Sequence, residues 1–133
     1  MTEPYLAIRV IMMPRDTNPH GTIFGGILLS YIDQAGALGA RHEVVRAGGP
    51  PPVLVTVALN RVEFCRPVLV GDVVSFRTTL VRLGRTSVTV QVAVEAERAG
   101  EILRVTEAEA VYVGIDPDSP ERRPVPLVPE RVV

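Results

Sequence analysis

One carboxylate, Asp33, lies in the middle of a stretch of sequence that is otherwise almost entirely apolar. Residues 23–40 are apolar apart from Ser30, Asp33 and Gln34. If this stretch is helical, no side chain one turn before or after Asp33 can form an ion pair with it. A carboxylate in such surroundings is a candidate general base. It could equally be a structural carboxylate, bonded to backbone amides or to an arginine from elsewhere in the chain.

Two further features near Asp33 could contribute to chemistry on a carbonyl group. Gly25 and Gly26 stand where the helix should begin, so their backbone N–H groups could bind a developing oxyanion. The lack of a Cβ atom would let a substrate approach the backbone, although two glycines would also simply allow a tight passage from loop to helix. Asn18 precedes Pro19, which is typical of a turn.

The composition excludes several other kinds of site. His20 and His42 are distant in the sequence and Cys65 is the only cysteine, so we expect no metal site. The single cysteine also excludes an intrachain disulfide, which favours a cytoplasmic location. With 14 basic and 15 acidic residues, the chain lacks the basic excess of a nucleic-acid-binding protein. No cofactor is implied.

The order of the predicted elements indicates one domain, residues 1–133, of the α+β class. A strand at 5–13 and a turn-rich segment precede the long helix, which the glycines and prolines at 48–52 end. Strands are expected at 53–64, 73–83, 86–97 and 102–115, the last three as an antiparallel meander. Alternating valines should turn one face of the 86–97 strand to the core. Residues 116–133 are rich in proline and should run over the surface as an extended tail.

The helical stretch is apolar on all sides, which is typical of a buried helix. It is short for a membrane span and carries a charge at its centre, so we expect no membrane association. One broad stripe should be covered by the sheet: Phe24, Ile27, Leu28, Tyr31, Ala35 and Leu38. The side that carries Asp33 has mostly small residues, where another close neighbour should pack: Gly26, Leu29, Gly36, Ala37 and Ala40.

Several motifs resemble those of the acyl-CoA hydrolase (YciA-type) branch of the hot-dog thioesterases. They lie at residues 13–26, 30–36, 55–58, 64–67, 70–74, 84–87 and 124–130, so the resemblance spans nearly the whole chain. The pattern Asn-x-x-Gly-x-x-Phe-Gly-Gly, followed by Asp33, is the most specific part. The resemblance implies a hot-dog fold, in which a five- to six-stranded antiparallel sheet wraps around one long central helix. It also implies a homodimer whose sheets join, often with three such dimers in a hexamer.

The same resemblance implies an enzyme that hydrolyses acyl-CoA to a free fatty or short-chain acid and coenzyme A. Asp33 matches the family's essential carboxylate, either as general base on water or as nucleophile on the thioester. Asn18 matches the essential amide, which a different subunit donates to the same site. Gly26, and less directly Gly25, would supply N–H groups to the oxyanion. The face of the helix that carries Asp33 would lie along the subunit interface.

Other positions match family residues that contact the substrate. Gly84, Arg85, Thr86 and Ser87 resemble the coenzyme A contact, where a guanidinium can hold a phosphate through two hydrogen bonds. Thr56 and Arg66 match positions near the pocket. His20 stands where the family more often has a small or amide side chain, and it would line the pocket or complete the turn.

Two other functions remain open on sequence grounds. One is a hydroxyacyl thioester dehydratase on the same fold, which would need His20 near Asp33. The other is a module that binds acyl-CoA without turnover. Acyl chain length depends on pocket depth, which the sequence does not define.

Overall fold

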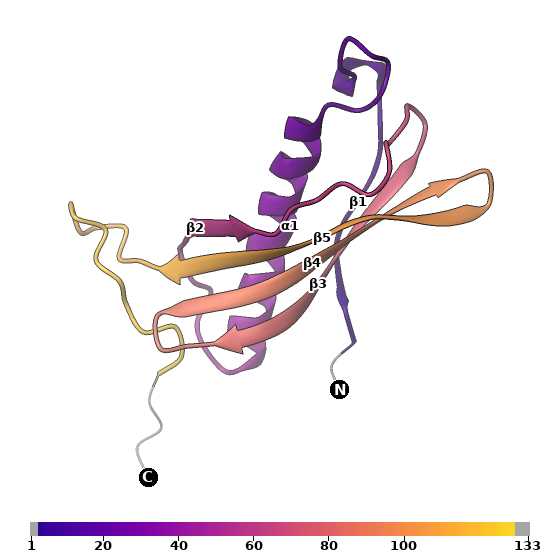
Figure 1. Cartoon of the computed structure of the whole chain (residues 1–133). Helices are drawn as coiled ribbons and strands as arrows, with labels where there is room; N and C mark the ends of the chain where they lie inside the picture. Colours follow the sequence, from indigo (N-terminus) through magenta and orange to yellow (C-terminus); the bar gives the residue numbers. More distant parts are fainter. Residues whose placement is uncertain (1–2, 130–133) are drawn as a thin grey trace.

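The computed structural model describes residues 3–129 (Figure 1). Its elements are β1 (Tyr5–Ile11), the short 3-10 helix η1 (Pro14–Asp16), α1 (Gly25–Arg46), β2 (Leu54–Asn60), β3 (Val73–Leu83), β4 (Ser87–Arg98) and β5 (Glu101–Gly114). The predicted α+β fold, one long helix on an antiparallel sheet, is confirmed. The strand predictions hold within two residues at each end, except that β2 ends at Asn60 rather than at 64.

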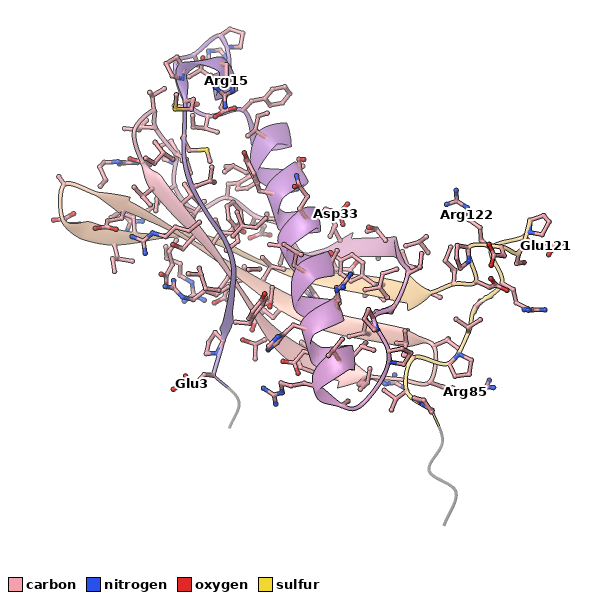
Figure 2. The ribbon with its side chains drawn as sticks, turned by 180° about the vertical axis from the view of Figure 1, so that it is seen from behind. Glu3, Arg15, Asp33, Arg85, Glu121 and Arg122 are labelled. Atoms are coloured by element: carbon pink, nitrogen blue, oxygen red, sulfur yellow. The ribbon has the colours of Figure 1, made fainter. Side chains whose placement is uncertain are left out.

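The five strands form one sheet in the order β1-β3-β4-β5-β2, with every neighbouring pair antiparallel. The strands β3, β4 and β5 are the predicted meander. The chain leaves the β1 edge through α1 and returns to the opposite edge as β2, so α1 crosses one face of the sheet (Figures 1 and 2). The strand β2 is therefore an edge strand that lies beside the helix.

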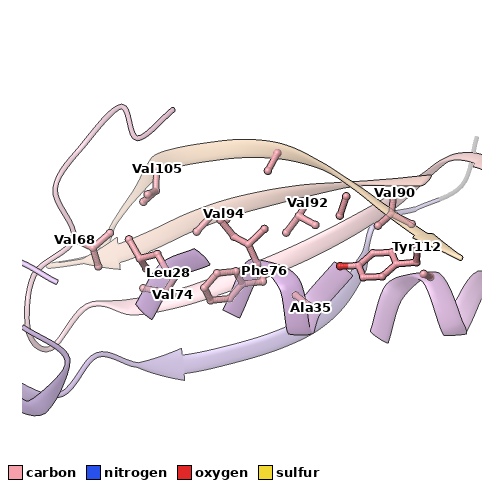
Figure 3. Packing of buried hydrophobic residues seen from close by; sticks show 14 of the residues in the cluster. Leu28, Ala35, Val68, Val74, Phe76, Val90, Val92, Val94, Val105 and Tyr112 are labelled. Carbon is pink, nitrogen blue, oxygen red and sulfur yellow. The ribbon is translucent and has the colours of Figure 1, made fainter. Parts of the chain in front are cut away.

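The core lies between α1 and the concave face of the sheet. In β4 the side chains of Val88, Val90, Val92 and Val94 are fully buried, as the alternation predicted. They pack with Phe76 of β3 and with helix residues such as Leu28 and Ala35 (Figure 3). This core fixes α1, and with it Asp33, against the sheet.

The predicted covered stripe of α1 is partly right, because Leu28 and Ala35 are buried and Ile27 and Tyr31 pack against the core, but its two end residues are not covered. Phe24 and Leu38, assigned to the covered stripe, are 57% and 43% exposed. The sheet instead covers a face that includes Ile32, Gly36 and Ala40. Because the helix is apolar on all sides, hydrophobicity alone did not distinguish its faces.

Close packing decides the orientation of α1. A Cβ atom at Gly36 would collide with the Tyr112 hydroxyl, and one at Gly39 would collide with Thr78. Glycine is required where the sheet approaches the helix backbone most closely. The small residues predicted to meet another neighbour thus partly meet the chain's own sheet, whereas Gly26 and Leu29 remain exposed.

The C-terminal tail runs mostly over the surface, as predicted, but one apolar side chain anchors it. It turns after Asp116, and the backbone N–H of Val125 donates to the carbonyl oxygen of Gly114 at 2.9 Å. The side chain of Leu127 is buried in the core, 3% exposed. The prediction of a surface tail did not include this buried leucine. Residues 130–133 of the predicted 116–133 segment lie outside the described residues.

An ion pair between the buried Asp72 and the partly exposed Arg98 ties the β2–β3 connection to the end of β4. Arg98 donates from Nη2 and Nε to the two carboxylate oxygens of Asp72, at 2.7 and 3.0 Å, and also from Nη2 to the Pro67 carbonyl oxygen. The N–H of Leu69 donates to the same carboxylate. The Arg98 hydrogen bond holds the pKa of Asp72 below its usual value, although burial opposes the shift.

We expect Asp72→Asn to lower the free energy of unfolding by about 2 kcal/mol at pH 7, because it removes charge-assisted hydrogen bonds. A lowered carboxyl pKa stabilises the fold above its ordinary value of about 4, and this contribution is lost as pH falls through the lower native pKa. Urea unfolding of both proteins at one concentration should therefore show a difference that shrinks in acid. The exposed Asp118→Asn is the control. A difference that is absent at pH 7, or equal at pH 7 and pH 3, would contradict this role.

Candidate active site

Asp33 lies near the middle of α1, on the side that faces β2 (Figure 2). Its side chain is half-buried. The Thr56 hydroxyl of β2 donates to Oδ1 at 2.7 Å. The Tyr112 hydroxyl of β5 lies 2.8 Å from the backbone carbonyl oxygen of Asp33 and 3.2 Å from Oδ1. Among residues 3–129, none donates a hydrogen bond to Oδ2.

The sequence left two environments open for Asp33, an apolar one and one with backbone amides or an arginine as partners, and the structure shows neither. The partners of Asp33 are two neutral hydroxyls from the sheet. As predicted, no side chain of α1 itself pairs with the Asp33 carboxylate. Thr56, predicted near the pocket, does lie beside Asp33.

Tyr112 is the residue near Asp33 that the sequence analysis missed. Its side chain is 1% exposed. Burial raises the pKa of the Tyr112 phenol, and the charge of the Asp33 carboxylate raises it further. The phenol is therefore a protonated donor at neutral pH. The alternation of β5, which buries Ala108 and Ala110, would have turned Tyr112 inward, and a buried tyrosine hydroxyl needs a partner.

The helix begins at Gly25, as predicted, and its first N–H groups are open. Phe24 is the N-cap and makes no side-chain capping bond. Among residues 3–129, no group accepts a hydrogen bond from the N–H of Gly25 or Gly26. These donors, at the positive end of the helix dipole, can bind an anionic oxygen. Asp33 lies about 10 Å further along the helix axis, at 1.5 Å per residue.

Asn18 and His20 lie in the loop that precedes α1. The Asn18 Oδ1 accepts from the backbone N–H groups of His20 and Thr22, at 2.9 and 3.2 Å, and Nδ2 donates to the Thr22 hydroxyl at 2.7 Å. Asn18 thus acts as a turn residue within its own chain. One of its two amide N–H donors remains available. The His20 side chain is exposed.

The predicted coenzyme A contact lies at the β3–β4 hairpin. The Gly84 N–H donates to the Ser87 carbonyl oxygen at 2.8 Å and closes the turn. Arg85 is exposed and lies at about the level of the C-terminal end of α1, whereas the loop near Arg15 lies beyond its N-terminal end (Figure 2). Arg66 is exposed on the β2–β3 connection.

A single chain therefore brings together only part of the predicted site. Asp33 and Thr56 are in contact, but the Asn18 loop and Arg85 lie toward opposite ends of the helix. Beside Asp33 the sheet ends at β2, and apolar side chains are exposed on this side, including Leu29 and Val57. An unpaired strand edge with exposed apolar residues is typical of a contact surface.

Residues 3–129 contain neither a candidate metal site nor a candidate membrane-spanning helix. No group of three or more histidine, cysteine, aspartate or glutamate side chains is placed to hold a metal ion. Within the same residues, no helix has the length and hydropathy needed to cross a membrane.

The chain is similar to known proteins in both sequence and structure. The family profile of the thioesterase superfamily matches residues 20–103. The acyl-CoA thioester hydrolase YciA of Salmonella typhimurium is 39% identical over 127 residues, which are 92% of this chain and 90% of that protein.

Solved structures give the same result. A hexameric hotdog fold thioesterase of Campylobacter jejuni superposes with a TM-score of 0.79 and 36% identity, covering 91% of this chain and 90% of its own. The hexameric thioesterase y2039 of Yersinia pestis superposes with a TM-score of 0.83 and 32% identity, covering 98% and 100%.

Proposed function

The chain belongs to the thioesterase superfamily and is an acyl-CoA thioester hydrolase, and we propose that it works through a site shared by two subunits, in which Asp33 supplies the reacting carboxylate. The observation that carries the proposal is the environment of Asp33. The Thr56 hydroxyl donates to Oδ1 and the Tyr112 hydroxyl lies 3.2 Å from it, while Oδ2 has no donor among residues 3–129. A carboxylate held through one oxygen leaves the other, Oδ2, available to take a proton or to attack a carbonyl carbon.

Either of two routes uses Oδ2. As a general base, it removes a proton from a water molecule that attacks the thioester carbonyl. As a nucleophile, it attacks that carbon itself and forms a mixed anhydride, which water then hydrolyses. In both routes the carbon–sulfur bond breaks, and coenzyme A leaves as a thiolate that takes up a proton.

Asn18 and Gly26 act on the carbonyl oxygen of the substrate. The open N–H of Gly26, with the helix dipole, stabilises the negative charge that develops on this oxygen. The spare amide N–H of Asn18 orients the carbonyl or the water. Both lie at the N-terminal end of α1, so we assign them to one subunit and Asp33 to its partner.

The coenzyme A part of the substrate contacts residues outside the reacting centre. Gly25 lets the thioester approach the helix backbone, and Arg85, with Gly84, Thr86 and Ser87, binds a phosphate of coenzyme A. Arg66, Thr56 and His20 line the remaining approach. No cofactor takes part, because the hydrolysis needs only water.

We propose a homodimer formed along β2 and α1, with three dimers in a hexamer, in the cytoplasm. The unpaired edge of β2 and the exposed apolar residues beside it support the dimer. The similar proteins of Campylobacter jejuni and Yersinia pestis are hexamers, which supports the larger assembly. Light scattering on the purified protein tests it against the chain mass of 14.4 kDa.

Thiol release from saturated acyl-CoAs of increasing chain length tests the function. We expect hydrolysis of the panel, and a higher KM for the matching acyl-pantetheine thioesters, which lack the nucleotide phosphates that Arg85 binds. Binding without thiol release would indicate a non-catalytic module. Hydration of an enoyl-CoA without thiol release would indicate a dehydratase, so either result contradicts the proposal.

A further inference from the structure

Tyr112 contacts Asp33 through a hydroxyl that no step of the proposed reaction uses. We infer that Tyr112 is a positioning residue that, together with Thr56, fixes the Asp33 carboxylate through Oδ1 and so makes Oδ2 the reacting oxygen. This inference rests on the proposed role of Asp33. It assigns different tasks to the two oxygens of one carboxylate.

The sheet register brings the two hydroxyls to one point. Thr56 of β2 and Tyr112 of β5 are direct partners across the antiparallel pair. Directly opposed residues are the closest side-chain neighbours in a sheet. The register of β2 shifts immediately after Thr56, and such an irregularity redirects side chains next to it. Both hydroxyls thus reach the same carboxylate oxygen, Thr56 at 2.7 Å and Tyr112 at 3.2 Å.

The helix leaves room for the tyrosine hydroxyl. Gly36 lies one turn after Asp33, and a Cβ atom there would collide with the Tyr112 hydroxyl. The hydroxyl is therefore held against the helix, toward which the Tyr112 ring points (Figure 3). There it also contacts the Asp33 carbonyl oxygen at 2.8 Å. One hydroxyl consequently links the backbone and the side chain of the same residue. This link restricts the rotation of the Asp33 side chain.

The remaining oxygen is defined by elimination within residues 3–129. Thr56 donates to Oδ1, the single hydroxyl proton of Tyr112 is shared between the Asp33 carbonyl oxygen and Oδ1, and Oδ2 receives no donor. Because the Tyr112 ring is buried and rigid, it holds Oδ1 at little further entropic cost. A small misplacement of a reacting group can lower a rate by up to about 100-fold. The hydroxyl of Tyr112 should therefore act on turnover and not on substrate affinity.

The variant Tyr112→Phe removes this hydroxyl and retains the ring. We expect kcat to fall about tenfold or more and KM to change less than twofold, because the lost interaction acts on the reacting oxygen and not on bound substrate. The matched control is Tyr5→Phe, on the opposite edge strand, where the ring stacks on His42 at a centroid distance of 4.1 Å. It should retain wild-type kcat. Each variant loses one hydroxyl and keeps its ring, and thermal unfolding verifies that both variants are folded.

A second background separates positioning from a general structural effect. If Tyr112 acts through Asp33, adding Tyr112→Phe to Asp33→Ala should change the residual rate less than twofold, since the positioned group is already absent. An equal loss in both backgrounds would show that Tyr112 acts independently of Asp33 and would overturn the inference. Wild-type kcat in Tyr112→Phe would also overturn it.

The same measurements distinguish a failure of the proposed function from a failure of the inference about Tyr112. If the wild type fails to release thiol, or if Asp33→Ala retains wild-type activity, the proposed function fails. If the wild type is active, Asp33→Ala is inactive and Tyr112→Phe behaves like the wild type, only the inference about Tyr112 fails.

Discussion

Replacing Asp33 by alanine is expected to lower kcat for acyl-CoA hydrolysis by about 10³-fold or more. A positioned general base contributes roughly 10² to 10⁴ to a rate, and a nucleophile that is deleted leaves no covalent route. The remaining activity would come from binding and from the oxyanion donors, which the substitution does not touch. Steady-state thiol release, with substrate binding measured separately, gives the effect.

The change should leave the fold and the assembly intact. Asp33 is half-buried and contacts only neutral hydroxyls among residues 3–129, so alanine leaves no unpaired buried charge. Asp116→Ala is the matched control: it removes a carboxylate that pairs with Arg123 in the tail and should keep kcat within about twofold. Activity of Asp33→Ala within tenfold of the wild type would remove this residue from the reaction.

The second large effect is expected at Asn18, where aspartate is a sharper substitution than alanine. Aspartate keeps the acceptor oxygen that the backbone N–H groups of His20 and Thr22 bind, so the turn is retained. It removes the amide donor and, in the proposed site, adds a negative charge near the developing oxyanion. We expect kcat to fall about 10²-fold or more, as for the loss of an oxyanion-hole donor.

A structural role for Asn18 makes a different prediction. The amide also donates to the Thr22 hydroxyl at 2.7 Å, and Thr22→Val removes that partner while leaving the amide in place. If Asn18 only stabilises the loop, Thr22→Val should lower kcat and Asn18→Asp should not. If the amide acts on the substrate, Asn18→Asp should lower kcat and Thr22→Val should keep it within about threefold.

The strands were predictable because their burial is periodic. The valines of β4 alternate without interruption, and each faces the core, so a period of two identified the strand and its inner face. The helix lacked this information. With apolar residues on all sides, its orientation depended on which glycines the sheet approaches, and Gly36 and Gly39 are explained only by the positions of Tyr112 and Thr78.

In the candidate site, too, some residues could be predicted from the sequence and others could not. Asp33 could be identified as an isolated carboxylate, because that requires only residue types along one helix. Its partners Thr56 and Tyr112 come from two other strands, and their convergence depends on the β2–β5 register, which hydrophobic patterns do not define. In the proposed site, the roles of Asn18 and Arg85 depend on how two subunits are arranged, since within one chain these residues lie toward opposite ends of α1.

The shared site is tested most directly by mixing two inactive variants. Asp33→Ala and Asn18→Asp chains are combined in equal amounts, dissociated and reassembled. If Asp33 of one subunit works with Asn18 of its partner, each mixed dimer regains one wild-type site, and two-fold symmetry predicts about a quarter of wild-type activity. If mixed oligomers form and the activity stays at that of the separate variants, the two residues do not act across the interface, and the proposed site is contradicted.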